Sequence, residues 1–263
     1  MTATLTVAAC QMSAGDDVAE NLSAIRDGIR DAAQAGAGLV VFPEAAMSRF
    51  GSDLAAAAQP LDGPFATAIR ETAEEHDVVA VVGMFEPADA GRVYNTLLAT
   101  GPGVDERYRK IHLFDAFGSK ESDHVAPGEE LVTIDVDGVC VGLATCYDVR
   151  FADQFTALGQ RGAQLVVLPA SWGDGPGKGD QWDLLARARA HDAQAWLLAC
   201  DQAWSPPEGS QPLGVGRSQL VDPLGVVHAA LDHRPGLLVG RIDVGHVADV
   251  RQRVPVLSSL AGR

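Results

Sequence analysis

The stretch VCVGLATCYDVRF, residues 139–151, changes its pattern in the middle. Up to Ala144 it is an apolar run interrupted only by Gly142, which is typical of a strand buried on both faces. A helical pattern begins at Tyr147, so Cys146 lies at a sharp switch from strand to helix. We expect its sulfur to be held out of the sheet near a helix N-terminus, where N–H groups and the dipole favour a thiolate. A small buried core cysteine is the alternative.

A short internal repeat relates the two halves of the chain. GAGLVVFPEA begins at Gly36 and GAQLVVLPAS begins at Gly162, an offset of 162 − 36 = 126 residues. Each copy follows a helical pattern and precedes a second helix, a buried strand and a hairpin. Two such halves facing each other predict an α/β fold, a four-layer α-β-β-α sandwich. The strand ends that carry Glu44 and Cys146 would then share one end, where layered folds place their sites.

Amphipathic helices and buried strands fill the rest of the chain. Helices are expected from Asp16 or Asp17 to the glycines of AGAG, from Gly63-Pro64 to about Asp77, from about Asp153 to Arg161, and from about Asp180 to Ala195. Further strands or hairpins are expected at 5–12, 78–86, 92–114, 131–146, 195–204, 216–231 and 237–244, before a short tail.

Composition limits the class of protein. The 263 residues are 47% hydrophobic, which predicts a single domain over 1–263 that buries about three-quarters of its surface. The net charge of −15 makes nucleic acid and anionic membranes poor partners. No apolar run approaches the ~18 residues of a membrane span, and MTATLTVAACQM resembles a first strand and not a signal peptide. We therefore expect a cytoplasmic protein with reduced thiols.

The remaining cysteines and the histidines offer no second site. Three cysteines lie in apolar runs like core residues: Cys10, Cys140 and Cys200. No cysteine pair has metal-ligand spacing, and a disulfide framework is not expected at this length. The seven histidines show no HxH or HExxH pairing, so we expect them to be structural or exposed.

Three residues with complementary chemistry lie at the ends of predicted elements: Glu44, Lys110 and Cys146. Amide hydrolysis by a thiol needs a sulfur nucleophile, a base that moves its proton, and donors for the developing oxyanion. A thiol, a carboxylate and an ammonium group supply these functions. A loop glutamate, a surface lysine and a core cysteine are the structural alternatives, each plausible alone and less so together.

The blocks around these residues resemble a known family. VFPEA, YRKIHLF and CYDVRF resemble, in the same order, the three signature blocks of the nitrilase or carbon–nitrogen hydrolase superfamily. The resemblance runs from the first strand to about Val239 and includes ESDHVAPG, DQWDLLARARAHDAQ and LVDPLGVV. The nearest branch is that of the Nit-type ω-amidases and deaminated-glutathione amidases.

The resemblance implies a role for each residue of the site. Glu44 would be the general base and then the general acid, and Cys146 the nucleophile that forms a thioester. Lys110 and the backbone N–H of Tyr147 would be the oxyanion donors. Glu121 would order Lys110 and the hydrolytic water. The resemblance also implies an αββα fold, no metal and no cofactor.

Assembly and function follow from the same resemblance. It implies a homodimer or higher homo-oligomer, with the helix after Cys146 and part of the tail, about residues 245–263, as candidate interface. The expected activity is hydrolysis of a small linear, carboxylate-bearing amide with release of ammonia. A nitrilase or N-carbamoyl amidohydrolase with the same triad is the alternative. A Cys–His glutaminase-type enzyme and a non-catalytic binding protein are less favoured.

Departures from the family pattern concern the substrate pocket. Arg49-Phe50-Gly51 stands where the branch often has Pro-Tyr-Gly, Gln181 stands where a histidine is common, and the loop from Lys110 to Glu121 is short. We expect Arg49, five residues after Glu44, to grip the substrate carboxylate in a bidentate manner. Arg150 is expected to form a structural ion pair under the nucleophile, and Lys178 to compete with Arg49 from the GDGPGKG loop. The candidate substrate-binding residues are Arg49, Phe50, Trp172 and Lys178.

Overall fold

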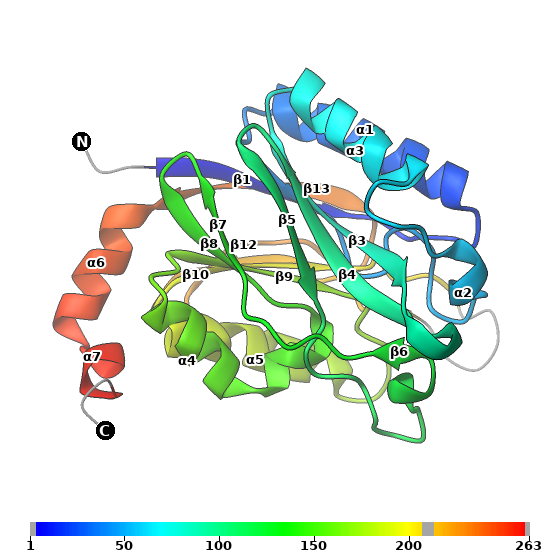
Figure 1. The fold of residues 1–263 in the computed structure, drawn as a ribbon. Coiled ribbons are helices and arrows are strands. Elements are labelled where there is room, and N and C mark those ends of the chain that lie inside the picture. Colours follow the sequence, from blue (N-terminus) through cyan, green and yellow to red (C-terminus); the bar gives the residue numbers. More distant parts are fainter. Residues whose placement is uncertain (1–3, 207–212, 261–263) are drawn as a thin grey trace.

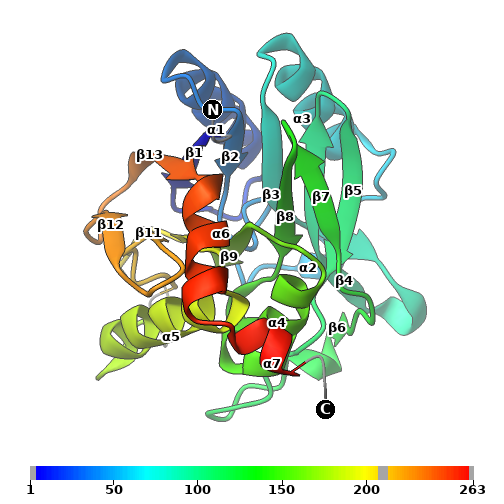
Figure 2. The same cartoon turned by 90° about the vertical axis from the view of Figure 1, so that its left-hand side faces the viewer.

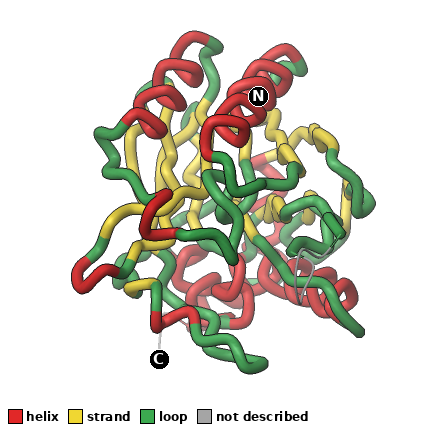
Figure 3. The backbone as a smooth tube through the Cα atoms, turned by 90° about the vertical axis from the view of Figure 1, so that its right-hand side faces the viewer, coloured by secondary structure: helices red, strands yellow, loops and turns green. Residues whose placement is uncertain are grey.

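Two β-sheets face each other between two layers of helices in the computed structural model (Figure 1). The structure describes residues 4–206 and 213–260. Seen from the side, strands occupy the middle of the molecule and helices its two outer faces (Figure 3). The predicted four-layer α-β-β-α sandwich is therefore confirmed.

The first sheet has the order β13-β1-β2-β3-β4-β5, with β6 beside β4. Its strands are β13 (Gly236–Asp243), β1 (Thr4–Gln11), β2 (Leu39–Val41), β3 (Val79–Pro87), β4 (Val93–Gly101), β5 (Val104–Arg109) and β6 (Val125–Ala126). β1, β2 and β3 are parallel, and β4 and β5 form the predicted antiparallel hairpin.

The second sheet has the order β12-β11-β10-β9-β8-β7. Its strands are β7 (Thr133–Val136), β8 (Val139–Leu143), β9 (Leu165–Ala170), β10 (Trp196–Asp201), β11 (Gln219–Val221) and β12 (Val227–Ala230). β8, β9 and β10 are parallel. β2 and β9, the strands of the two repeated segments, thus each lie at the centre of three parallel strands.

Helices cover the outer face of each sheet (Figure 1). The α-helices are α1 (Val18–Gln34), α2 (Leu54–Ala57), α3 (Pro64–Glu75), α4 (Ala152–Gln160), α5 (Lys178–Ala193), α6 (Val244–Arg253) and α7 (Val256–Leu260), and the 3-10 turns are η1 (Asp89–Gly91), η2 (Glu121–Asp123) and η3 (Cys146–Arg150). α1 and α3 pack on the first sheet, and α4 and α5 on the second. Asp17 caps α1 and Pro64 opens α3, as predicted. None of the helices described in 4–206 and 213–260 is both long and apolar enough to cross a membrane.

Apolar side chains fill the space between the sheets as well as the space under the helices. Val7 and Val41 of the first sheet belong to the same buried cluster as Leu143 and Val167 of the second. Because both faces of the central strands are covered, these strands read as continuous apolar runs. The site lies at one end of these strands.

The C-terminal segment joins the two halves, which the sequence did not predict. β13 pairs antiparallel with β1 at the edge of the first sheet. α6 and α7 then run down one side of the sandwich toward α4 (Figure 2). There the guanidinium of Arg251 donates to the carbonyl oxygens of Ala163, Ala193 and Gln194 in the second half. Residues 261–263 of the predicted tail lie outside the described residues.

Candidate active site

Glu44 lies just beyond the C-terminal end of β2 and is fully buried. Its Oε1 accepts hydrogen bonds from Lys110 Nζ at 2.9 Å and from Asn95 Nδ2 at 2.8 Å. Its Oε2 accepts one from the backbone N–H of Ser171, at 2.9 Å. Since Ser171 follows β9 of the other sheet, the carboxylate links the two halves of the molecule at one end.

Lys110 follows β5 and lies between two carboxylates. Its ammonium group, 2% exposed, is 2.9 Å from Glu44 Oε1 and 2.9 Å and 3.1 Å from the two oxygens of Glu121. Burial disfavours the charged form, but the charges of Glu44 and Glu121 outweigh it and hold the pKa of Lys110 well above its usual value. The lysine is therefore an ammonium ion with three protons to donate.

Glu121 begins the short turn η2 and is tied to the loop that precedes it. Its Oε2 also accepts a hydrogen bond from the backbone N–H of Phe114 at 2.6 Å. The carboxylate thus holds the segment after Lys110 in place while it contacts the ammonium group. The structure brings Glu44, Lys110 and Glu121 together, as the sequence resemblance implied.

Cys146 is the first residue of η3 and lies in the left-handed region, with φ of 46°. Such a conformation is uncommon for a residue other than glycine. Burial and the neighbouring carboxylate of Glu44 raise the pKa of Cys146 well above that of a free thiol, against the opposing charge of Lys110 and a hydrogen bond from Ser171 N–H. This raised pKa opposes the thiolate that we expected, because η3 is a single short turn and the sulfur is buried beside a carboxylate.

A buried carboxylate holds the turn that carries the cysteine. Asp148 Oδ2 accepts hydrogen bonds from the backbone N–H of Thr145 at 2.9 Å and from the hydroxyl of Tyr108 at 2.6 Å. Its Oδ1 lies 2.9 Å from His112 Nδ1 and accepts from the backbone N–H of His112 at 3.1 Å. Asp148 therefore connects the cysteine turn to the segment that follows Lys110, and His112 is structural, as predicted.

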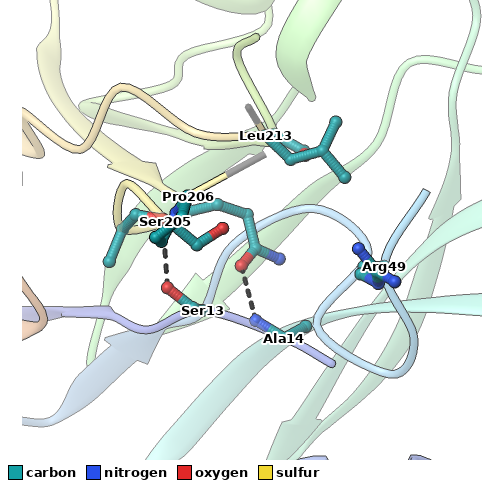
Figure 4. Close-up of a pocket in the computed structure, with 9 residues that line it drawn as sticks. Ser13, Ala14, Arg49, Ser205, Pro206 and Leu213 are labelled. Atoms are coloured by element: carbon teal, nitrogen blue, oxygen red, sulfur yellow. Dashed lines mark hydrogen bonds between the residues drawn. The ribbon is translucent and has the colours of Figure 1, made fainter. Parts of the chain in front are cut away.

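Arg49 is paired with Asp16 and borders a small pocket. Its guanidinium donates to the Asp16 carboxylate at 2.6 Å and 3.1 Å. Figure 4 shows it across the pocket from Ser13 and Ser205. Ser171, whose N–H binds Glu44, also lines this pocket. Arg49 thus lies near the predicted site, but a carboxylate of the chain already occupies its bidentate face.

The other predicted substrate-binding residues separate into two groups. Phe50 packs edge-on against Phe85, with ring centroids 5.7 Å apart. Trp172 is 4% exposed and donates from its indole N–H to the carbonyl of Lys178 at 3.0 Å, which closes the loop between them. Lys178 Nζ lies 5.3 Å from the Trp172 ring centroid and 4.5 Å from that of Phe117. Lys178 and Trp172 therefore form one aromatic and cationic cluster.

Arg150 belongs to this cluster and corrects one expectation. Within the described residues it forms no ion pair; its guanidinium lies 4.8 Å from the Trp172 ring centroid and donates to Gln181 Oε1 at 3.0 Å. The predicted structural ion pair is wrong, because the carboxylate under the nucleophile, Asp148, is occupied by Tyr108 and backbone donors. Burial and the charge of Arg150 lower the pKa of Lys178, while Cys146 opposes them.

Two contributors to the site were missed by sequence reasoning. Asn95 lies inside a strand pattern, VYNTLL, that reads as ordinary core, and Ser171 acts through its backbone. Asp201, fully buried at the end of β10, accepts a hydrogen bond from the N–H of Trp172 at 2.7 Å. It thereby holds the start of the loop between Trp172 and Lys178. In residues 4–206 and 213–260 no group of three or more His, Cys, Asp or Glu side chains is arranged to hold a metal ion.

Comparison with solved structures defines the class of fold. The chain superimposes on the NitFhit protein of C. elegans with a TM-score of 0.88 and 30% sequence identity, covering 98% of this chain and 65% of that one. The present chain therefore spans about two-thirds of that protein. The two facing sheets between helices are the fold of the nitrilase superfamily.

The family follows from the sequence match. The model of the carbon–nitrogen hydrolase family matches residues 6–252, so this chain belongs to that family. A hydrolase of Mycobacterium tuberculosis is 48% identical over 263 residues, covering 95% of this chain and 94% of that protein. The deaminated glutathione amidase of Escherichia coli O157:H7 is 35% identical (87% and 86% covered), and the human omega-amidase is 32% identical (95% and 92% covered).

Proposed function

We propose that this carbon–nitrogen hydrolase is an amidase that cleaves a small linear, carboxylate-bearing amide through a thioester on Cys146 and releases ammonia. The observation that carries the proposal is the buried cluster of Glu44, Lys110 and Glu121 beside Cys146 at the shared end of the two sheets. The names of the relatives, a deaminated glutathione amidase and an omega-amidase, support the same reaction class.

The first half of the reaction forms the thioester. Because the pKa of Cys146 is raised, the thiol gives its proton to Glu44 as the sulfur attacks the amide carbon. Lys110 donates to one oxygen of Glu44 and to both oxygens of Glu121. A proton released from one of the two Glu121 contacts can turn to the developing oxyanion, with the N–H of Tyr147 as second donor. The carbon–nitrogen bond then breaks while Glu44 returns the proton to the leaving nitrogen.

The second half regenerates the enzyme. Water attacks the thioester carbon, a carboxylate takes its proton, and the carbon–sulfur bond breaks to give the acid product and the thiol. Glu44 is the base for this step as well, and Glu121 orders Lys110 and the water. The balance is one amide plus one water to one acid plus one ammonia, with no oxidant or reductant.

A positively charged cluster supports an anionic substrate. Lys178 and Arg150 lie over the same Trp172 ring, and within the described residues neither pairs with a carboxylate. Lys178 is close enough to Cys146 for a negative charge on that sulfur to raise the pKa of the lysine. Since Arg49 is held by Asp16, we assign the acid end of the substrate to Lys178 with Arg150.

An ammonia-release screen of the wild-type protein tests the function. It compares ω-amides such as succinamate with deaminated glutathione, nitriles and N-carbamoyl compounds. We expect the ω-amides to be favoured, and Cys146→Ala to abolish release while Cys140→Ala, on the same strand segment, retains it. Release from nitriles or carbamoyl compounds alone would assign the alternative reaction, and full activity of Cys146→Ala would refute the thioester.

A further inference from the structure

Asn95, on β4, is a neutral side chain that contacts both carboxylates of the site. It is 1% exposed, and its Nδ2 lies 2.8 Å from Glu44 Oε1 and 3.3 Å from Glu121 Oε1. Lys110 Nζ contacts the same two oxygens. The amide therefore repeats the donor pattern of the ammonium group without its charge.

The two oxygens of Glu44 differ in the number of donors that they accept. Each carboxylate oxygen has two lone-pair sites, and those of Oε1 are taken by Lys110 and Asn95. Among the described residues, Oε2 accepts a hydrogen bond from the N–H of Ser171 alone, which leaves it one lone-pair site. Thr145, the residue before the cysteine, donates from its hydroxyl to the carbonyl of Pro169 at 2.9 Å, so the cysteine turn lies beside the end of β9 that carries Ser171. The thiol therefore lies on the Ser171 and Oε2 side of the carboxylate, where the Ser171 N–H also acts to lower its pKa.

The orientation of the Asn95 amide follows from the same contacts. Reversing the amide would set its oxygen against two carboxylate oxygens, so Nδ2 must face them. Its Oδ1 is then buried, and within the described residues it has no hydrogen-bond partner. An unpaired buried acceptor is destabilising, so a role confined to stability would favour a residue that needs no such acceptor.

The geometry points to Asn95 as a positioning residue that fills Glu44 Oε1 and thereby makes Oε2 the atom that exchanges protons with Cys146 and the leaving nitrogen. The inference rests on the proposed function, because it assigns the proton path of that reaction. The amide neither takes nor gives a proton itself. The thiol proton moves to Oε2 as the carbon–sulfur bond forms, and from Oε2 to nitrogen as the carbon–nitrogen bond breaks.

The test compares Asn95→Ala and Asn95→Asp with Thr96→Val as the matched control. Thr96, the next residue on β4, donates to a different buried carboxylate, Glu86, at 2.7 Å on the opposite face of the strand. The readout is the pH dependence of kcat/KM for ammonia release from succinamate, with circular dichroism to verify folding.

Asn95→Ala removes a donor from the base, so the carboxylate holds a proton more readily. We expect the acidic limb of the profile to move up by about one pH unit, with kcat lowered more than KM is changed. Asn95→Asp, which keeps the size of the side chain, should be slower than the alanine variant at pH 8. The difference in kcat/KM between these two variants should become smaller as pH falls, because a protonated carboxyl group at position 95 can donate a hydrogen bond again. Thr96→Val should keep the wild-type limb.

An unshifted acidic limb in a folded Asn95 variant, or the same shift in Thr96→Val, would overturn the inference. If Asn95→Ala does not fold, the Asn95→Asp profile decides alone, and a limb equal to that of the wild type refutes the assignment. Failure of the proposed function has a different signature. In that case the wild-type protein releases no ammonia from any compound of the screen, or Cys146→Ala remains active.

Discussion

Replacing Lys178 by methionine removes one positive charge from the mouth of the site and keeps most of the apolar volume. The Lys178 ammonium lies near the rings of Trp172, Phe117 and Phe114, at 4.5 to 5.8 Å from their centroids. The aliphatic part of methionine can occupy the same aromatic surroundings. The substitution therefore tests the charge and not the packing.

The expected loss follows from the type of contact. A hydrogen bond to a charged group contributes about 1.5–3 kcal/mol, which corresponds to roughly 10- to 150-fold in kcat/KM. The Lys178 side chain is only partly buried, so solvent screening favours the lower part of this range. Because the substrate's acid end does not change during the reaction, we expect KM to rise more than kcat falls.

Two substrates of equal length distinguish the loss of a charge contact with the substrate from general damage to the site. Succinamate carries a carboxylate, and butyramide has a methyl group in its place. Lys178→Met should impair ammonia release from succinamate and leave butyramide nearly unaffected. Lys120→Met is the control, since Lys120 is exposed on a nearby loop and paired with Asp123 at 2.9 Å. An equal loss on both substrates, or a larger selective loss with Arg49→Met, would refute the assignment of the acid end to Lys178.

Four further predictions concern the same framework. Gly83→Ala should inactivate the enzyme and lower its free energy of unfolding in urea by about 1–3 kcal/mol. The reason is that an added Cβ would lie 2.5 Å from the carbonyl oxygen of Pro43, next to the base Glu44. Wild-type activity in this variant would contradict the prediction. Lys110→Arg should fold but show no rescue of turnover relative to the alanine variant, since a planar guanidinium differs from a compact ammonium. Burial disfavours the charged form of His112, but the hydrogen bond and charge of Asp148 outweigh it and raise the pKa of the imidazole. The charged imidazole should therefore stabilise the fold fully below about pH 6.5, and this contribution should fade as pH rises above that value. The Tm values of the wild type and of His112→Gln should converge at high pH. Light scattering should give twice the 27.5 kDa chain mass, the homodimer that we propose, and a monomer at micromolar concentration would exclude it.

The fold and the charged centre were predictable because local patterns mark them. Glu44 and Cys146 each end a short apolar strand, and the repeated segments 126 residues apart predict that those strand ends meet. The pairing of the last strand, β13, with the first strand, β1, was not predictable. The position of an edge strand depends on its pairing register and on the residues that it covers, which no local pattern in the sequence gives. The helices α6 and α7 likewise depend on contacts with the second half, such as those of Arg251.

Residues that act through distant partners left no local signal. Asn95 lies 51 residues from Glu44 and 26 from Glu121, inside a strand whose polar residue resembles any inward-facing asparagine. The donor from Ser171 is a backbone N–H, which no residue type encodes. The raised pKa of the Cys146 thiol was not predictable for the same reason. Its place after a strand was clear, but the buried carboxylate that raises its pKa comes from the other half of the chain.

The acidity of the chain determines how its positive charges should be interpreted. With 35 acidic and 20 basic side chains, carboxylates outnumber the cations of the chain. Lys110 contacts two of them and Lys120 one, and Arg49 pairs with Asp16 across 33 residues of sequence. Within the described residues Lys178 has no such partner, although burial and Arg150 both disfavour its charge. A carboxylate that binds there would offset this penalty, which is why we propose this position for the acid end of the substrate.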